Sequence, residues 1–348
     1  MSVIVGTGAF TPFGLNALQT AFLLRTGMPA MTWSPLADQQ GEPVTFGLQG
    51  TLDPEKTGGA RALDLALPAF DEAVAPLLPF ADRLRIGVVL SLDEELAPKS
   101  SWSGPNPGGE LLAAFERHVL SRFPHSKVTV VARGAGGPGQ VLPDAITALS
   151  RFEIDALIFG GAHTDYDPAR IRWLEDQGRL FTVSNLDAIV PGECAAFVAL
   201  MAPDVARRAN LPVLGRVGSI ASGFEEATPD NDLSAYEAKG LTAAVRAATR
   251  AFVGEKRTAG WMLTDSTFEM RRLYEWQSVI TRTREVWGEP FVVEAPAQRM
   301  GLLAAAALPL LMVTAAEGFS RNFAPSPLAV LMTGSDGGER TALVMEAV

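Results

Sequence analysis

Histidine and cysteine are scarce in this chain of 348 residues, which contains three histidines and one cysteine. The histidines are His118, His125 and His163, so no histidine follows residue 163. Cys194 has no second cysteine with which to form a disulfide inside the chain, and this usage favours a reducing compartment. We therefore expect a cytoplasmic protein whose C-terminal half has no histidine for catalysis or metal binding.

Long apolar runs and excess positive charge are lacking too. The most apolar run, residues 301–313, is shorter than the roughly 20 residues of a spanning helix and contains Pro309, which predicts a buried core helix. The chain begins with a strand-like MSVIVGTG and shows no signal-peptide pattern. The formal net charge of −10 and the isoelectric point near 4.9 argue against nucleic acid or an anionic membrane as partner.

Strand-like and helix-like segments alternate along the chain. Hydrophobic residues make up 47% and aromatic residues 8%, a composition suited to buried sheets covered by helices. Apolar runs predict strands at 3–5, 86–90, 128–131, 156–159, 196–200, 260–263, 329–332 and 341–346. Helical patterns are found at 64–78, 110–122, 143–151, 236–252 and 300–316. Turn-forming or acidic residues predict surface loops at 97–109 and 224–233.

One segment has a strand–turn–helix–strand plan. Residues 128–161 read VTVVARGAGGPGQVLPDAITALSRFEIDALIFGG, in which a glycine-rich turn separates the first strand from the helix. The turn lacks the Gly-Lys-Ser/Thr sequence that would bind a phosphate, so a nucleotide site is not expected there.

This segment resembles the nucleophile region of the β-ketoacyl synthases, the condensing enzymes of the thiolase superfamily. Further motifs similar to those of the family follow its order over nearly the whole chain: residues 3–14 (VIVGTGAFTPFG), 86–91 (IGVVLS), 187–200 (DAIVPGECAAFVAL), 333–338 (TGSDGG) and 341–345 (TALVM). The resemblance implies an α/β thiolase-like fold with two pseudo-twofold-related βα halves in a five-layered αβαβα arrangement. The halves are expected at residues 1–207 and 208–348.

The side chains that perform condensation in the family are absent from the matching positions. Ala135 falls where the family has its nucleophilic cysteine. Thr264 or Asp265 replaces one catalytic histidine, and Arg299 or Met300 replaces the other. Because condensation needs a thiolate and donors that stabilise an oxyanion, the resemblance implies a degenerate relative without cofactor or metal.

Several residues remain candidates for the former acyl site. Asp336 stands in place of the family's gatekeeper phenylalanine, and the Gly337–Gly338 turn after it has backbone N–H groups that could bind an oxyanion. Glu193 matches an acidic residue that has a supporting structural role in the family. Pro143 lies within the expected nucleophile helix, where proline is poorly tolerated, and indicates that this helix begins late.

His163 is the one histidine near the site in family terms. With Asp165 and Asp167 it forms a His-x-Asp-x-Asp pattern, a spacing open to metal ligation, but without supporting ligands elsewhere a structural role is favoured. Cys194 is expected to be an inert buried thiol, as free cysteines commonly are.

The segment after the strand at 260–263 is unusually polar. Asp265, Glu269 and Arg272 lie close together there. We predict that they form a buried ion-pair network that fixes geometry and performs no acyl chemistry.

Two functions from different classes follow. The preferred one is a non-catalytic ketosynthase-like protein that acts by association, either as a chain-length-factor-like partner of an active ketosynthase or as an adaptor for secretion cargo and its chaperone. It would form a homodimer or a heterodimer with a ketosynthase-like protein, and an acyl carrier protein is a further candidate partner that the negative net charge disfavours. The alternative is an acyltransferase or acyl-binding enzyme with a rewired site, using Asp265, Glu269, His163 or Asp336 as acid or base.

Overall fold

A computed structural model describes residues 2–97, 106–229, 231 and 236–348. The predicted loops at 97–109 and 224–233 therefore lie partly outside the described residues.

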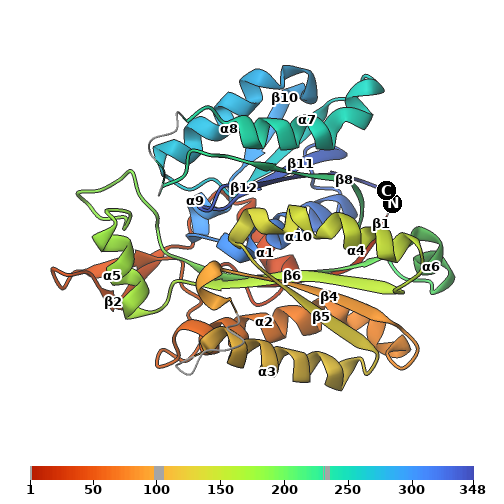
Figure 1. The fold of residues 1–348 in the computed structure, drawn as a ribbon, viewed down its shortest axis with the longest axis horizontal. Helices are drawn as coiled ribbons and strands as arrows, with labels where there is room; N and C mark the ends of the chain where they lie inside the picture. The colour runs from red at the N-terminus through yellow and green to blue at the C-terminus, as the bar shows by residue number, and fades with distance from the viewer. Residues whose placement is uncertain (1, 98–105, 230, 232–235) are drawn as a thin grey trace.

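Ten strands of the described chain form one hydrogen-bonded sheet in the order β10-β9-β11-β12-β8-β1-β7-β6-β4-β5 (Figure 1). These strands are β1 (Ser2–Phe10), β4 (Ile86–Leu92), β5 (Ser126–Ala132), β6 (Ala156–Thr164), β7 (Glu193–Met201), β8 (Gly215–Phe224), β9 (Ala259–Thr264), β10 (Trp287–Glu294), β11 (Leu328–Gly334) and β12 (Glu339–Glu346). A separate pair consists of β2 (Thr32–Ala37) and β3 (Pro43–Phe46). Each of the eight predicted strands is present.

Helices lie on both sides of each half of this sheet (Figure 1). The helices are α1 (Ala17–Leu24), α2 (Gly58–Val74), α3 (Pro107–Arg122), α4 (Leu142–Ser150), α5 (Pro168–Asp176), α6 (Pro203–Arg208), α7 (Lys239–Gly254), α8 (Met270–Arg282), α9 (Ala297–Met300) and α10 (Ala307–Ser320). In Figure 1 the layers run from α7 and α8, through strands β8–β12, then α1, α4 and α10, then β1 and β4–β7, to α2 and α3. The predicted five-layered thiolase-like fold is confirmed.

The strand order divides by position in the chain. The five strands on one side of the order, β1 and β4–β7, end by Met201, and the five on the other side begin at Gly215. The two sets meet where β1 pairs with β8 through only three residue pairs, from Ser2 to Ile4. The predicted division between residues 207 and 208 falls at the end of α6.

The central helix α10 is apolar all round because it lies between both sets of strands. Every residue from Ala307 to Phe319 is buried, and α10 contacts β1, β6 and β7 on one side and β11 on the other. Pro309 falls in its first turn, where a missing backbone N–H removes no helical hydrogen bond. The predicted core helix is present, but it begins at Ala307, after α9 and a short 3₁₀ turn (η5, Ala304–Ala306).

The glycine-rich turn after β5 is a 3₁₀ segment (η3, Gly134–Gln140) that packs against β12. Close approach requires glycine here, because a Cβ on Gly136 would lie 2.1 Å from the carbonyl oxygen of Glu339. Pro143 lies in the first turn of α4, so this helix begins late, as the proline predicts. The consequence for the site is that Ala135 precedes α4 by more than one turn and does not lie at its N-terminus.

Candidate functional site

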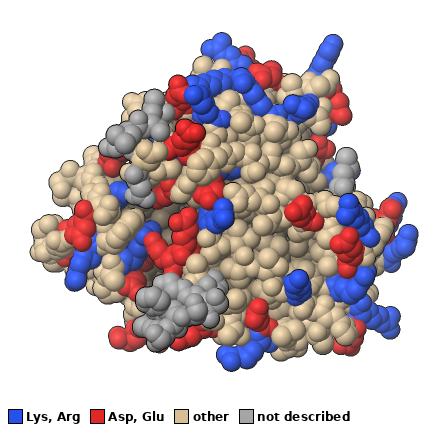
Figure 2. Space-filling view, viewed as in Figure 1, with Lys and Arg blue, Asp and Glu red and all other residues tan. Residues whose placement is uncertain are grey.

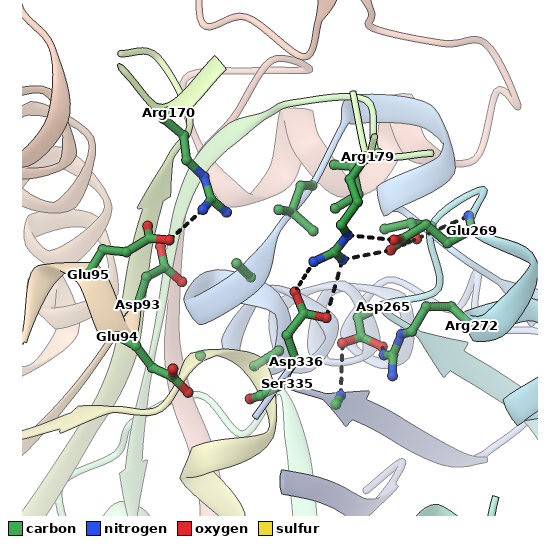
Figure 3. A pocket seen from close by; sticks show the side chains of 17 residues that line it. Asp93, Glu94, Glu95, Arg170, Arg179, Asp265, Glu269, Arg272, Ser335 and Asp336 are labelled. Carbon is green, nitrogen blue, oxygen red and sulfur yellow. Dashed lines mark hydrogen bonds and ion pairs between the residues drawn. The ribbon is translucent and has the colours of Figure 1, made fainter. Parts of the chain in front are cut away.

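A cavity of about 120 Å³ opens where several strands end (Figure 3). Its walls come from the segments that follow β4, β5, β9 and β11, together with α5 and the segment between α9 and α10. Seventeen residues line it: Asp93, Glu94, Glu95, Gly134, Ala135, Arg170, Arg179, Ile189, Asp265, Thr267, Glu269, Arg272, Leu302, Ala304, Gly334, Ser335 and Asp336. The predicted positions Ala135, Asp265 and Asp336, which lie far apart in the sequence, are therefore brought together.

The cavity is dominated by charge. Six carboxylates and three guanidinium groups line it, and Figure 2 shows acidic and basic side chains around a hollow left of centre. An acyl chain needs apolar walls, because transferring it between charged groups gains little from burial and costs those groups their solvation. The composition of the walls does not suit a fatty acyl substrate.

Asp265 and Arg272 belong to one buried network of ion pairs. Arg272 donates to Asp265 over 2.5 Å and to Glu275 over 2.6 Å, and Glu275 accepts from Arg340 over 2.5 Å. The backbone N–H of Gly334 donates to the second oxygen of Asp265 over 2.9 Å. Burial raises the pKa of Asp265, although Arg272 and Gly334 oppose the shift. Both oxygens of Asp265 are thus occupied, as expected of a residue that fixes geometry.

Glu269 does not join that network, which corrects the sequence prediction. Its carboxylate instead accepts from Arg179 over 2.9 Å, and Arg179 also donates to Asp336 over 2.8 Å (Figure 3). Arg271 makes a further ion pair with Asp336 over 3.0 Å. Partial desolvation favours the neutral form of Asp336, but Arg179 and Arg271 outweigh it and hold the pKa of this half-exposed carboxyl well below its usual range. Asp336 is therefore a fixed anion.

His163 lies behind the cavity wall, and its side chain is not in the lining. The ring is 2% exposed and is held between Asp93, 2.6 Å from Nδ1, and Asp165, 3.0 Å from Nε2. Burial disfavours the charged ring, but the two carboxylates outweigh it and raise the pKa of His163 to about 10. The doubly protonated ring orients Asp93, whose other oxygen accepts from the backbone N–H of Ala305 over 3.0 Å.

The His-x-Asp-x-Asp pattern is not assembled around a common point. Asp165 accepts from His163 and from Arg170, the latter over 2.9 Å. Asp167 caps α5 by accepting from the backbone N–H of Ala169 over 2.8 Å. Among the residues that the structure describes, no three His, Cys, Asp or Glu side chains are placed to hold a metal ion.

Glu193 and Cys194, both on β7, lie outside the cavity lining. Arg61 donates twice to the Glu193 carboxylate, over 2.6 and 2.9 Å, and both side chains are almost fully buried. The adjacent thiol of Cys194 is completely buried, and burial raises its pKa. A buried, neutral thiol is a poor nucleophile, as the sequence predicts for Cys194.

Three further predicted positions, Thr264, Gly337 and Gly338, lie outside the cavity lining. Thr264 is buried at the end of β9, where its hydroxyl accepts from the backbone of Ser266 over 3.3 Å. Gly337 and Gly338 form the turn between β11 and β12, and the Gly338 N–H already donates to Ser335 over 3.2 Å.

Arg299 and Met300, the positions matched to the second histidine, also lie away from this cavity. The same segment contributes Leu302 and Ala304 to the lining instead. Met300 is fully buried, and Arg299 donates to the backbone oxygen of Leu24.

Sequence reasoning missed much of the cavity. Asp93, Glu94 and Glu95 follow β4 directly, and a signal for them existed, because the carboxyl ends of neighbouring parallel strands meet at one edge of a sheet. Burial, together with the nearby carboxylates Glu339 and Asp336, raises the pKa of Glu94. For Arg170 and Arg179 the local sequence gives no such signal.

Ser335 is the one lining residue with a hydroxyl beside Ala135. Its Oγ donates to the carbonyl of Arg133 over 2.5 Å and accepts from the N–H of Gly136 over 2.8 Å. No imidazole, amine or carboxylate is hydrogen-bonded to it among the described residues. The hydroxyl holds the glycine-rich turn in place and lacks the adjacent base that activates a serine nucleophile.

The layered fold is similar to that of solved ketosynthase structures. Many solved structures are similar to this chain, among them three that match its whole length. A chain from the complex of a type II polyketide synthase acyl carrier protein with its ketosynthase has a TM-score of 0.83, 15% identity and 99% of its own length covered. The ishigamide ketosynthase/chain length factor has a TM-score of 0.80, 15% identity and 99% coverage. The ketosynthase from module 6 of the Bacillus subtilis bacillaene synthase has a TM-score of 0.79, 14% identity and 72% coverage.

These similarities establish the fold. No protein-family model and no curated protein sequence matches the chain. Of the helices in the described residues, none has the length and apolarity needed to cross a membrane.

Proposed function

We propose that this chain is a non-catalytic ketosynthase-fold protein that works by association with another protein. The observation that carries this proposal is the chemistry of the cavity at the strand ends. Ala135 supplies a methyl group where the family resemblance places a nucleophile, and four of the six lining carboxylates, Glu95, Asp265, Glu269 and Asp336, are each paired with a lining arginine. Groups that neutralise one another in this way have no spare capacity to activate an acyl thioester.

An exposed sheet edge offers a surface for the association. β5 is the last strand in the sheet order. One of its edges pairs with β4, and the other has no strand partner among the described residues. An unpaired strand edge has a row of backbone N–H and C=O groups that a strand from another chain can satisfy. Lys127 and Thr129 are exposed along this strand, and the middle of the face over β4 and β5 carries few charged side chains (Figures 1 and 2).

The fold supports two kinds of partner. The condensing enzymes that the sequence resembles form dimers through their central sheets, and one similar structure is a ketosynthase/chain length factor. A chain-length-factor-like role beside an active ketosynthase therefore fits, as does an adaptor that uses the same edge to hold secretion cargo or its chaperone. Both roles use the apolar scaffold and neither needs a nucleophile.

The alternative, an acyltransferase or acyl-binding enzyme, has less support. Of its candidate acids and bases, Asp265, Glu269 and Asp336 are each paired with an arginine, and His163 is held between two carboxylates outside the cavity. Burial raises the pKa of two further lining carboxyls, Glu94 and Glu95, but no side-chain thiol lies in the described lining of the cavity, and its serine hydroxyl has no adjacent base.

The test is to purify the gently tagged chain from its native host and to determine its mass in solution and its co-purifying proteins. A stoichiometric ketosynthase with an intact cysteine supports the chain-length-factor role, and a secretion cargo or chaperone supports the adaptor role. A chain that carries acyl groups and turns over acyl thioesters without any partner contradicts the proposal.

A matched pair of variants locates the surface. Thr129→Lys places a charge on the β5 edge and should weaken the complex, because charged residues on an edge oppose strand pairing. Thr281→Lys makes the same exchange at an exposed position on α8, on the opposite side of the fold, and should leave the complex intact. Equal complex formation by both variants excludes the β5 edge.

A further inference from the structure

A second cavity, of about 260 Å³, lies beside β9 and β10, the two strands at the opposite end of the sheet from β5. It shares no lining residue with the first cavity. It is bounded by the end of α1, by β9 and β10, by α9, and by the segment after α10. The walls combine apolar side chains, among them Val292, Phe323 and Trp261, with charged ones. The volume of this cavity is close to the lower limit of ligand pockets in proteins, which span roughly 300–1,000 Å³, so the cavity suits a small molecule.

Two guanidinium groups converge on this cavity. Arg25 lies over the ring of Phe323, with Cζ 4.6 Å from the centroid. Arg299 lies on the other wall and donates one N–H to the backbone oxygen of Leu24. Within the described residues neither Arg25, which is exposed, nor Arg299, which is half-buried, has a carboxylate within ion-pair distance. The buried arginines Arg61, Arg272 and Arg340 each do.

One carboxylate, Glu294, faces the same space. The indole N–H of Trp261 donates to its Oε2 over 2.9 Å. Burial raises the pKa of Glu294, and the positive charges of Arg299 and Arg25 act against that rise. With two guanidinium groups and one carboxylate the lining has a net positive charge, so a monoanion would balance it.

We propose that this cavity binds a small aryl carboxylate. The carboxylate would accept hydrogen bonds from the guanidinium of Arg25 and the free donors of Arg299, since charge-assisted pairs of this kind are the strongest that such a ligand can make. The aromatic ring would lie against Phe323 and Val292, where an offset or edge contact with the phenyl ring adds to apolar burial. Arg299, which the sequence assigned to the former acyl site, acts here instead.

The test is calorimetric titration of the full chain with 3-phenylpropionate at pH 7.5. Saturable one-site binding is expected, and the neutral isostere 3-phenylpropanamide should bind at least about tenfold more weakly because it lacks the charge that the arginines recognise. No saturable binding, or equal binding of acid and amide, overturns the proposal.

Variants of the lining residues test which side chains bind the carboxylate. Arg25→Ala should weaken binding about tenfold. Arg250→Ala should leave binding unchanged, because Arg250 is an exposed residue of α7 that lies outside the lining and has no ion pair with any described residue. Glu294→Gln should tighten binding several-fold, because the amide still accepts from Trp261 while the repulsive charge is gone. Within the described residues the side chain of Arg25 makes no hydrogen bond or ion pair, and its exposed contact with the Phe323 ring is weak, so its removal should affect folding little; an unchanged urea midpoint checks this. Equal effects of Arg25→Ala and Arg250→Ala, or weaker binding by Glu294→Gln, contradict the assignment.

Discussion

Replacing His163 by glutamine removes the positive charge that is hydrogen-bonded to both Asp93 and Asp165. Both carboxylates are largely buried, so the protonated ring stabilises the folded state. In the unfolded chain a histidine has a pKa near 6.5, and in the folded chain the pKa of His163 is raised to about 10. The difference of about 3.5, at about 1.4 kcal/mol for each unit of pH, sets an upper limit of about 5 kcal/mol on this stabilisation.

The sign of the pH dependence follows from the raised pKa. The stabilisation is fully present below pH 6.5, where both states bind the proton, and is lost as the pH rises toward 10. The free-energy difference between the wild type and His163→Gln should therefore be largest near pH 6 and should shrink steadily between pH 6.5 and pH 10. Urea unfolding of both proteins at pH 6, 7.5 and 9 measures it.

His118→Gln is the matched control. His118 also pairs with a carboxylate, Asp71, but at the surface, where both side chains are partly exposed. A surface pair contributes only about 0–1 kcal/mol, so this variant should change stability little at any of the three pH values. A loss in His163→Gln that stays constant from pH 6 to pH 9 would refute the reasoning, since it would show that the ring acts by packing alone.

Three further outcomes are expected. Arg61→Met should lower the free energy of unfolding by about 3–5 kcal/mol, because it leaves Glu193 buried without its cation. The double variant with Glu193→Leu should recover part of that loss. A loss below about 1 kcal/mol for Arg61→Met would contradict the pairing. Cys194 should resist iodoacetamide at pH 8 in the native protein and react after unfolding in urea, as mass spectrometry of the modified peptide would show; rapid native labelling would contradict its burial. Ala135→Cys should react with iodoacetamide more slowly than a free cysteine at pH 7.4 and should form no acyl-enzyme with acyl thioesters, because the 3₁₀ turn supplies no helix N-terminus and the cavity is rich in carboxylates; a fast-reacting thiol at this position would show that the site still favours a thiolate.

The fold was predictable because most of its strands have a recognisable apolar sequence pattern. β6 and β7 are buried on both faces and read as uninterrupted apolar runs, which is what a strand between two helical layers requires. β8 and β10 were missed for an equally physical reason. Half of β8 is partly exposed and contains glycines, and β10 contains Pro290 and an irregular register with β9, so neither strand shows a continuous apolar pattern.

The cavity was predictable only in part. Ala135, Asp265 and Asp336 line it as the motif order indicates. The partners in the ion pairs depend on the path of the backbone between distant segments, which local sequence does not show. Arg179 pairs with Glu269 and Asp336, which lie 90 and 157 residues away in the sequence. Short-range reasoning paired Glu269 with Arg272 because they are neighbours in the sequence, whereas the pairing in space is long-range.

The place of β1 in the sheet governs the order in which this protein can fold during synthesis. β1 is synthesised before both of its neighbours in the sheet, which are β7, ending at Met201, and β8, beginning at Gly215. All nine of its residues are buried in the finished protein. An apolar strand with both edges open must therefore wait while more than half of the chain is made, and during that time it can pair with another nascent chain. Yield in a foreign host should consequently depend on chaperone capacity and synthesis temperature more than on the stability of the folded state.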